Sequence, residues 1–215
     1  MSIRARIFLG FALIALAGAA WGGVALTLRE QFVNQAEEQH KLQTESSAFA
    51  EMISAHRSWK SNLIESVMNM TAFPGSLDPY TCFYGSWLKG EVAQNIDDAE
   101  VLRLMDEVFG PHERAHLDAL AIVQYIDRGN REAAKRELDA HIIPYLDETI
   151  SLYSQIVERY TVLMAETKEN SDKLANASFA LTMTFIALHF IIVVFLFMSV
   201  LFSKSISSSR QPPIP

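Results

Sequence analysis

Two long uncharged stretches lie near the two ends of the chain, and a charged segment of about 145 residues separates them. Residues 7–28 and residues 174–203 contain no Asp, Glu, Lys or Arg. A helix of about 20 apolar residues crosses the hydrocarbon core of a bilayer, so each stretch is long enough to span it. The pattern therefore predicts transmembrane helices at residues 7–28 and 178–202.

The intervening segment has the periodicity of helices. From Phe49 onward, apolar side chains recur at steps of three and four, which places them on one helix face. These positions are Phe49, Met52, His56, Trp59, Leu63, Val67 and Met70. No part of the segment shows the two-residue alternation typical of a strand. We expect an all-α fold, in which an antiparallel bundle of the four-helix type, long enough to bury its own core, is flanked by two transmembrane helices.

Proline and glycine predict where the helices of this segment end. They occur at Pro74-Gly75, Asp78-Pro79, Gly110-Pro111 and Gly129-Asn130. Asp97 or Asp98 is expected to cap a helix that ends before Gly110, and Pro111 suits the first turn of the next helix. The last helix is expected to begin near Arg131, to kink or restart at Pro144, and to continue into the second span.

These patterns divide the chain into seven regions. A short N-terminus and the first span are followed by a helical stalk, a helix-bundle sensor domain, a second stalk, the second span and a tail. The expected bounds are residues 1–6, 7–28, 29–45, 46–160, 161–177, 178–202 and 203–215.

The distribution of charge predicts an orientation. All 25 acidic residues and 14 of the 18 Lys and Arg lie between the apolar stretches. Only Arg4, Arg6, Lys204 and Arg210 lie outside them. Because Lys and Arg mark the cytoplasmic side, both termini are expected in the cytoplasm and the sensor domain outside. A net charge of −7 argues against a nucleic-acid partner, whose phosphates require a basic surface.

The first apolar stretch has an alternative interpretation as a cleaved signal peptide. Ala17-Gly18-Ala19 has the small residues of a cleavage site. The apolar run continues nine residues beyond Ala19, which favours an uncleaved membrane anchor. Gly18 and Gly22 are four apart, a spacing that lets two helices approach closely in lipid and favours a homodimer.

Cysteine and histidine are the residues with distinctive chemistry. Cys82 is the only cysteine, which excludes an internal disulfide, a Cys₄ zinc site and an iron–sulfur cluster. His112 and His116 are four apart and so emerge on one helix face, which continues through Leu120 and Val123. His56 falls on the apolar stripe of the first helix.

These four residues form a candidate metal site. A lone buried histidine is most often a hydrogen-bonded core residue. Three inward histidines and a cysteine without a common partner would be costly to bury. Neutral imidazoles and a thiolate together make the donor set of a tetrahedral zinc site.

Three short motifs of the outer segment match those of a known family. His-x-x-Trp-Lys, Cys-x-x-Gly-x-Trp and His-x-x-x-His occur in this order at residues 56–60, 82–87 and 112–116. With them, the segment from Ala55 to about Tyr153 resembles the chemoreceptor zinc-binding (CZB) domain of bacterial chemoreceptors and diguanylate cyclases. The resemblance covers about 100 of the 215 residues. The zinc ligands that it implies are His56, Cys82, His112 and His116.

The resemblance also implies a function. A helix bundle between two spans is similar to the outer sensory module of a methyl-accepting chemotaxis receptor, and residues 203–215 begin like a HAMP linker without an output domain. We therefore expect a two-span, homodimeric receptor of a bacterial inner membrane that signals to cytoplasmic partners. In the best-known members the CZB domain is cytoplasmic, whereas here it is expected on the outer side.

Two other functions fit parts of the sequence. His112-Glu113-x-x-His116 matches the HExxH motif of zinc metallopeptidases, whose glutamate is a general base. A charge at Arg114, and a metal with four protein ligands that leaves no position for catalytic water, argue against an enzyme. A metal-free sensor that binds a small ligand would have the same helices, and analysis of bound zinc distinguishes it.

Overall fold

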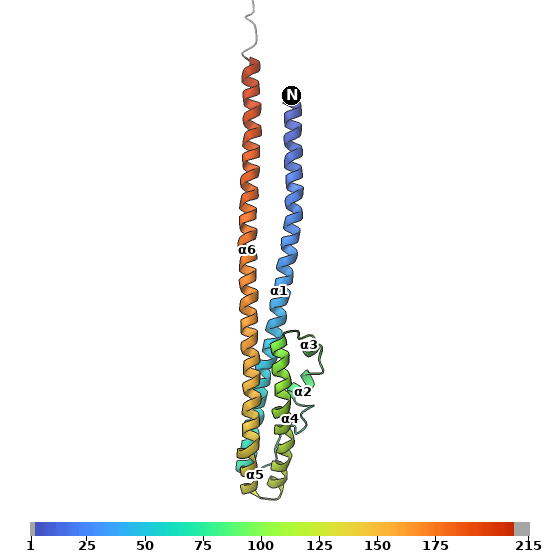
Figure 1. The fold of residues 1–215 in the computed structure, drawn as a ribbon, viewed down its shortest axis with the longest axis vertical. Helices are drawn as coiled ribbons and strands as arrows, with labels where there is room; N and C mark the ends of the chain where they lie inside the picture. The colour runs from blue at the N-terminus through green and yellow to red at the C-terminus, as the bar shows by residue number, and fades with distance from the viewer. Residues whose placement is uncertain (1–2, 209–215) are drawn as a thin grey trace, which may run out of the picture. The chain divides into compact units, whose positions relative to one another are not determined.

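The computed structural model describes residues 3–208, which form helices joined by turns and contain no strand. The predicted all-α class is thereby confirmed. The helices are α1 (Ile3–Asn69), α2 (Phe83–Trp87), α3 (Glu91–Gln94), α4 (Ala99–Asp127), α5 (Arg131–Glu137) and α6 (Ile143–Ser208), with a π-helical turn at Leu138–Ile142 (Figure 1). Residues 1–2 and 209–215, in the predicted N-terminus and tail, lie outside the described residues.

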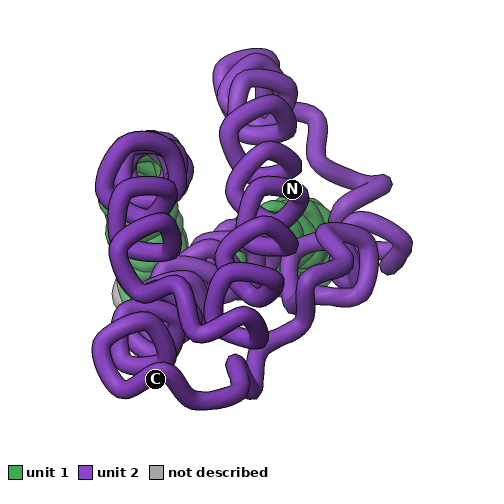
Figure 2. The backbone as a smooth tube through the Cα atoms, turned by 90° about the horizontal axis from the view of Figure 1, so that it is seen from below, with its two compact units in different colours: residues 1–37, 167–215 green, residues 38–166 purple. Residues whose placement is uncertain are grey.

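The chain forms two compact units, which Figure 2 distinguishes by colour. Unit 1 contains residues 1–37 and 167–215, and unit 2 contains residues 38–166. α1 and α6 contribute to both units, and the other helices belong to unit 2. Unit 2 includes the predicted sensor domain, residues 46–160, and the adjoining part of each predicted stalk.

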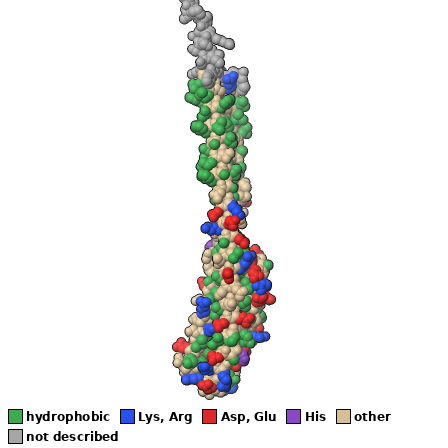
Figure 3. Space-filling model, turned by 60° about the vertical axis from the view of Figure 1, so that its left-hand side comes forward, with side chains coloured by type: hydrophobic (Ala, Val, Ile, Leu, Met, Phe, Trp, Pro, Cys, Tyr) green, Lys and Arg blue, Asp and Glu red, His purple; other side chains and the backbone are tan. Residues whose placement is uncertain are grey.

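Unit 1 carries the two apolar stretches, on its parts of α1 and α6. Both helices contain a stretch that is long and apolar enough to cross a membrane, as the sequence predicts. These stretches are scarcely buried: Phe8 and Phe195, for example, are 77% and 72% exposed. On the face drawn in Figure 3, hydrophobic side chains cover one part of the molecule, and charged side chains are spread over the remainder. The apolar stretches therefore differ from core helices of a soluble protein, which would be buried.

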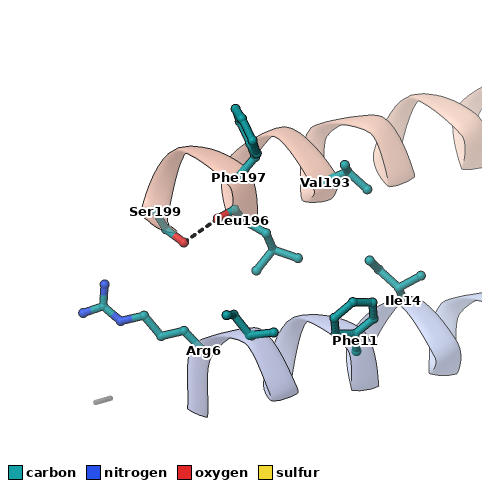
Figure 4. A pocket seen from close by; sticks show the side chains of 8 residues that line it. Arg6, Phe11, Ile14, Val193, Leu196, Phe197 and Ser199 are labelled. Atoms are coloured by element: carbon teal, nitrogen blue, oxygen red, sulfur yellow. Dashed lines mark hydrogen bonds between the residues drawn. The ribbon is translucent and has the colours of Figure 1, made fainter. Parts of the chain in front are cut away.

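Within unit 1 the two apolar stretches contact each other at a glycine. A Cβ atom on Gly10 would lie 2.6 Å from Leu196 Cδ1, so a larger residue would displace that leucine. Beside this contact the helices line an apolar cavity of about 400 Å³, with Arg6 at one end (Figure 4). A Cβ atom on Gly18 or Gly22 would meet nothing within 4 Å, so these positions take no part in the contact.

Within unit 2, α1 and α4 run in the same direction, and α6 runs opposite to both (Figure 1). Residue numbers rise together in the contacts that α1 makes with α4 and with the residue before its cap: Lys41–Asp97, His56–His112 and Trp59–His116. In the contacts of α1 with α6, the numbers rise on α1 and fall on α6: Phe49–Tyr160, His56–Tyr153 and Lys60–Asp147. The prediction of antiparallel packing is therefore wrong for α1 and α4. Fully extended, the connecting residues 70–98 would span about 100 Å, so even with α2 and α3 within them they are long enough to return along a helix of about 43 Å.

The core of unit 2 consists of two hydrophobic clusters, and α1, α4 and the α5–α6 segment contribute to both; Tyr84 of α2 and Ile96 also belong to the first. The first includes Phe49, Met52, Leu104, Val108, Tyr153 and Tyr160. The second includes Leu63, Val67, Ala119, Ile122, Ile142 and Leu146. Five residues of the predicted α1 stripe, Phe49, Met52, His56, Leu63 and Val67, are buried as expected. His56 on α1 and His112 on α4 fall between the two clusters, and His116 follows Ala115 of the second cluster.

α4 continues through Gly110-Pro111, so the predicted helix break is wrong. A proline in a helix interior costs about 3 kcal/mol because it removes a backbone hydrogen bond. Buried side chains lie on both sides of it along one face of α4, and each large apolar one, such as Val108 or Ile122, contributes about 1.5–3 kcal/mol. They include Val108, His112, Ala115, His116, Ala119 and Ile122. Leu120, predicted on this face, is 44% exposed, and Ala119 and Ile122 take its place.

Most helix ends follow the predicted signals. The Asp98 carboxylate caps α4 by accepting hydrogen bonds from two backbone N–H groups, and Gly129, at φ 70°, ends the helix. α1 ends at Asn69, earlier than the predicted Pro74-Gly75, and Met70 adopts φ 56°. The predicted kink or restart at Pro144 corresponds to the π-helical turn that directly precedes α6.

Candidate metal centre

Four side chains from different parts of unit 2 converge on one point. His56 comes from α1, Cys82 from the turn before α2, and His112 and His116 from α4. Each offers one ligand atom, and these atoms all lie within 4.8 Å of one another. The structure thus brings together the four residues predicted from the sequence, close enough to bind a metal ion.

His56 is oriented by a backbone hydrogen bond. Its Nδ1 lies 2.8 Å from the carbonyl oxygen of Met52, one helical turn earlier. Because a carbonyl only accepts, Nδ1 carries the proton and Nε2 keeps its lone pair. Nε2 is buried and has no hydrogen-bond partner among the described residues. This arrangement, with one ring nitrogen anchored and the other free, is typical of histidines that bind metals.

Cys82 is held at the N-terminus of α2. Its Sγ accepts a hydrogen bond from the Gly85 N–H at 3.4 Å and lies 3.2 Å from the Pro79 carbonyl oxygen. A Cβ atom on Gly85 would lie 2.1 Å from that carbonyl oxygen, so only glycine lets α2 pack here. The glycine of the Cys-x-x-Gly-x-Trp motif therefore positions the sulfur. Sγ is 3.2 Å from His112 Nε2.

The imidazoles of α4 complete the group. The ring centroids of His112 and His116 are 4.8 Å apart, and that of His56 is 5.2 Å from His112. Neither nitrogen of His116 has a hydrogen bond of standard geometry to the described residues. The nearby Ser76 carbonyl oxygen instead accepts a hydrogen bond from Trp59 Nε1 at 2.8 Å. His116 thus has the Ser76 carbonyl oxygen near its ring, but forms no well-aligned hydrogen bond with the described residues.

Aromatic rings surround the histidines. Trp59 lies 5.0 Å from His116, Tyr84 lies 5.0 Å from His112, and Tyr153 lies 5.3 Å from His56, measured between ring centroids. Neither Tyr84 nor Tyr153 belongs to the sequence patterns that predict the site. Tyr153 is detectable in principle, because Leu146, Tyr153, Ile156 and Tyr160 repeat at helical spacing on α6.

Burial keeps the histidines neutral. It lowers the pKa of His112 to about 3 and that of His116 to about 4; positive charge on His56 would add to the effect at both, and the Ser76 carbonyl oxygen opposes it at His116. Burial also lowers the pKa of His56, against the opposing hydrogen bond to Met52. Neutral imidazoles are the form that binds metals, so the site needs no proton release from its histidines near neutral pH.

Burial has the opposite effect on the sulfur. It raises the pKa of the Cys82 thiol, although the backbone N–H groups of α2 favour the thiolate. Without a cation, the protonated thiol is therefore favoured. A bound dication reverses this preference, because a thiol that coordinates a metal loses its proton.

The donor set fits a small tetrahedral cation. For zinc bonds of about 2.0–2.3 Å, tetrahedral geometry separates ligand atoms by about 3.3–3.6 Å. The contact of 3.2 Å between Cys82 Sγ and His112 Nε2 is already near this value, and no two ligand atoms are more than 4.8 Å apart. Nitrogen and sulfur donors suit zinc better than calcium or magnesium, which prefer oxygen.

Neighbouring charged groups lie outside this donor set. The Tyr80 hydroxyl donates a hydrogen bond of 2.9 Å to Glu113 Oε1, so the glutamate of the HExxH pattern is paired on the surface. His141 is exposed and forms a hydrogen bond of 2.6 Å with Glu137. His40 and His189 do not join the group.

Comparisons with known proteins supply no function for this site. No family model, no curated protein and no solved structure matches this chain. The interpretation of the site therefore depends on the three motifs, on the convergence of the four side chains, and on their chemistry.

Proposed function

We propose that this chain is a membrane-bound sensory receptor whose unit 2 binds one zinc ion through His56, Cys82, His112 and His116. The observation that carries the proposal is the convergence of three buried imidazoles and one thiol within 4.8 Å. Buried lone pairs without a partner are costly, and a shared cation would satisfy them together. The motifs that resemble the CZB family support zinc as the cation.

A structural or sensory role is favoured over catalysis. Four protein ligands would close the coordination sphere of zinc, whereas catalytic zinc keeps one position for water or substrate. Glu113 is paired with Tyr80 instead of facing the metal position. Zinc bound here would supply a crosslink, since it would hold α1, the turn before α2, and α4 together.

Signal transmission would use the long helices. α1 and α6 each extend from unit 2 into unit 1 as continuous helices. In unit 2, Lys60 of α1 pairs with Asp147 of α6 at 2.5 Å, close to the metal ligands in sequence. A change in packing at the metal centre would therefore shift α1 relative to α6 by about 1–2 Å, a known switching movement.

The apolar stretches support a position in a membrane. We propose that they span a bacterial inner membrane, with unit 2 outside and both termini in the cytoplasm. A homodimer is the proposed assembly, with Gly18 and Gly22 facing the second copy. Cysteine pairs introduced from residue 18 to residue 23 should crosslink between chains in membranes, with a yield that depends on zinc; no crosslink would contradict this arrangement.

Zinc content tests the proposal directly. The full chain, purified in detergent without chelator, should contain one zinc per chain, and X-ray absorption should show three nitrogen donors and one sulfur donor. The double variant His112→Ala, His116→Ala should lose the metal, while the exposed His141→Ala should retain it. A site without sulfur, or zinc that survives in the double variant, would refute the proposed ligand set.

A further inference from the structure

Unit 2 contains a second cavity, separate from the metal centre. Its volume is about 410 Å³, within the range of small-molecule sites. α1 and α3, with the residue that follows α3, line this cavity, named here the Glu45 cavity: His40, Lys41, Thr44, Glu45, Glu91, Val92 and Asn95. On α1, Glu45 precedes His56 by 11 residues, or about 16 Å along the helix axis.

Glu45 is the unusual residue of this cavity. It is only 3% exposed, although carboxylates are seldom buried without a paired charge. Tyr160 lies beside it, but its hydroxyl makes no hydrogen bond of standard geometry to the described residues. The ammonium of Lys41 pairs with Asp97 at 3.2 Å and acts on Glu45 only from a greater distance. The wall of the cavity therefore includes a buried acid that forms no ion pair within 4 Å among the described residues, although Lys41 and Tyr160 lie near enough to favour its ionised form.

Several hydrogen-bond donors in the wall are already used inside the protein. The Thr44 hydroxyl donates to the His40 carbonyl oxygen at 2.9 Å, and the Asn95 amide donates to the Glu91 carbonyl oxygen at 3.0 Å. The acceptors are less engaged: they are the two carboxylates, the lone pairs of the Thr44 hydroxyl and the amide oxygen of Asn95. An excess of acceptors is complementary to a ligand that carries donors and a positive charge.

We propose that the Glu45 cavity binds a small primary alkylamine. Its ammonium is held by the Glu45 carboxylate, Glu91 adds a second negative charge at the exposed side, and the alkyl chain contacts Val92. An ammonium has three donors and no acceptor, which matches this wall. An anionic ligand would face Glu45 and Glu91, and a neutral ligand would leave the buried carboxylate without a counter-charge.

Amine binding would also stabilise unit 2. The ligand would contact α1 and α3, which belong to segments far apart in the sequence. Ligands that bind only the folded state raise its stability by mass action. The site goes beyond the proposed zinc function and does not depend on it, since none of its residues is a metal ligand.

Calorimetric titration of the full zinc-loaded chain in detergent tests this site. The probes are n-butylamine and 1,4-diaminobutane, with 1-butanol and butyrate as neutral and anionic controls of similar size. We expect saturable binding of at least one amine with a Kd below about 10 mM and none of the two controls. Failure of both amines to saturate, or equal binding of butyrate, would overturn the proposal.

Two matched variants localise the binding. Glu45→Gln keeps the shape of the side chain but removes the charge, and should weaken amine binding by at least about tenfold. Glu51→Gln, at an exposed position of the same helix, should leave it unchanged. Zinc content and circular dichroism verify that each variant is folded. If Glu45→Gln does not fold, Glu91→Gln replaces it, with an expected loss of about threefold or more. Equal affinities of a folded cavity variant and Glu51→Gln would refute the assignment.

Discussion

The metal centre and the Glu45 cavity both place titratable side chains of α1 inside unit 2, but with opposite electrostatic results. At the metal centre, burial lowers histidine pKa values and leaves neutral groups with free lone pairs. At the cavity, burial raises the pKa of Glu45, although Lys41 and Tyr160 oppose the effect. Burial favours the uncharged form in both places. The same physical effect thus leaves neutral imidazoles that can bind a metal at one site. At the other site it makes the ionised carboxylate costly, and a bound cation would lower that cost.

The difference also concerns how each site is closed. Aromatic rings line the metal centre, and its ligand atoms converge within 4.8 Å. The Glu45 cavity has an open volume of about 410 Å³ and exposed residues at its edge. A closed cluster of soft donors suits a permanently bound ion, whereas an open cavity suits a ligand that exchanges.

Loss of the metal should have the largest effect. If free zinc exceeds Kd a thousandfold, binding stabilises the folded state by about 4 kcal/mol. For a unit of this size, a chelator or the double variant His112→Ala, His116→Ala should lower Tm by roughly 10–20 °C. Thermal unfolding followed by circular dichroism measures the change. Zinc added back should restore Tm in the wild type only; a chelator that leaves Tm unchanged would argue against a structural metal.

The second-largest effect should be the destabilisation of the metal-free protein by acid. Burial lowers the pKa of His112 to about 3 and of His116 to about 4, whereas the unfolded chain protonates histidine near pH 6.5. Below that pH the unfolded state binds more protons, so the free energy of unfolding falls by about 1.4 kcal/mol per pH unit for each such histidine. The contribution is complete above about pH 6.5 and is lost as pH decreases toward the folded pKa values.

Unfolding of the chelator-treated chain at a series of pH values from neutral to acid measures this dependence. The double variant His112→Ala, His116→Ala should show a shallower slope than the wild type, while His141→Ala keeps the wild-type contribution of the buried pair. Identical slopes in the wild type and the double variant would show that these histidines are accessible and titrate normally.

The position of Cys82 in the metal centre should depend on Gly85. A Cβ atom there would lie 2.1 Å from the Pro79 carbonyl oxygen, so Gly85→Ala must displace α2 and Cys82. We expect a loss of about 1–3 kcal/mol in stability, together with weaker zinc binding. Gly110→Ala is the matched control, because nothing lies within 4 Å of its Cβ and alanine favours a helix by about 1 kcal/mol. Calorimetry and zinc competition distinguish the two, and equal behaviour would remove the role assigned to Gly85.

The smallest effect is expected at Glu45. Burial raises its pKa above that of the unfolded chain, so the folded state binds more protons and stability falls as pH rises through the raised pKa. Glu45→Gln removes this penalty and should leave Tm equal or slightly higher at pH 8, with less dependence on pH above about 4.5. Glu51→Gln should behave as the wild type. A clear loss of stability in Glu45→Gln at pH 8 would mean that the ionised carboxylate is well compensated.

The sequence determined the helical class, the apolar stretches and the four residues that converge. These features follow from local information: steps of three and four, uninterrupted apolar runs, and the rarity of cysteine and histidine in a core. The Asp98 cap and the end of α4 at Gly129 were also predicted, because capping depends on a few neighbouring backbone groups.

The tertiary structure decided what local signals cannot contain. Pro111 predicts a break, but burial of one continuous face of α4 outweighs the lost hydrogen bond. The parallel direction of α1 and α4 depends on the path of residues 70–98, which carries little periodicity. The Glu45 cavity was not foreseen either, because Glu45 lies in a polar stretch of sequence, and only the packing of Tyr160 and α3 around it makes that carboxylate buried. Burial of a single polar residue depends on which distant segments cover it, and no local pattern records that.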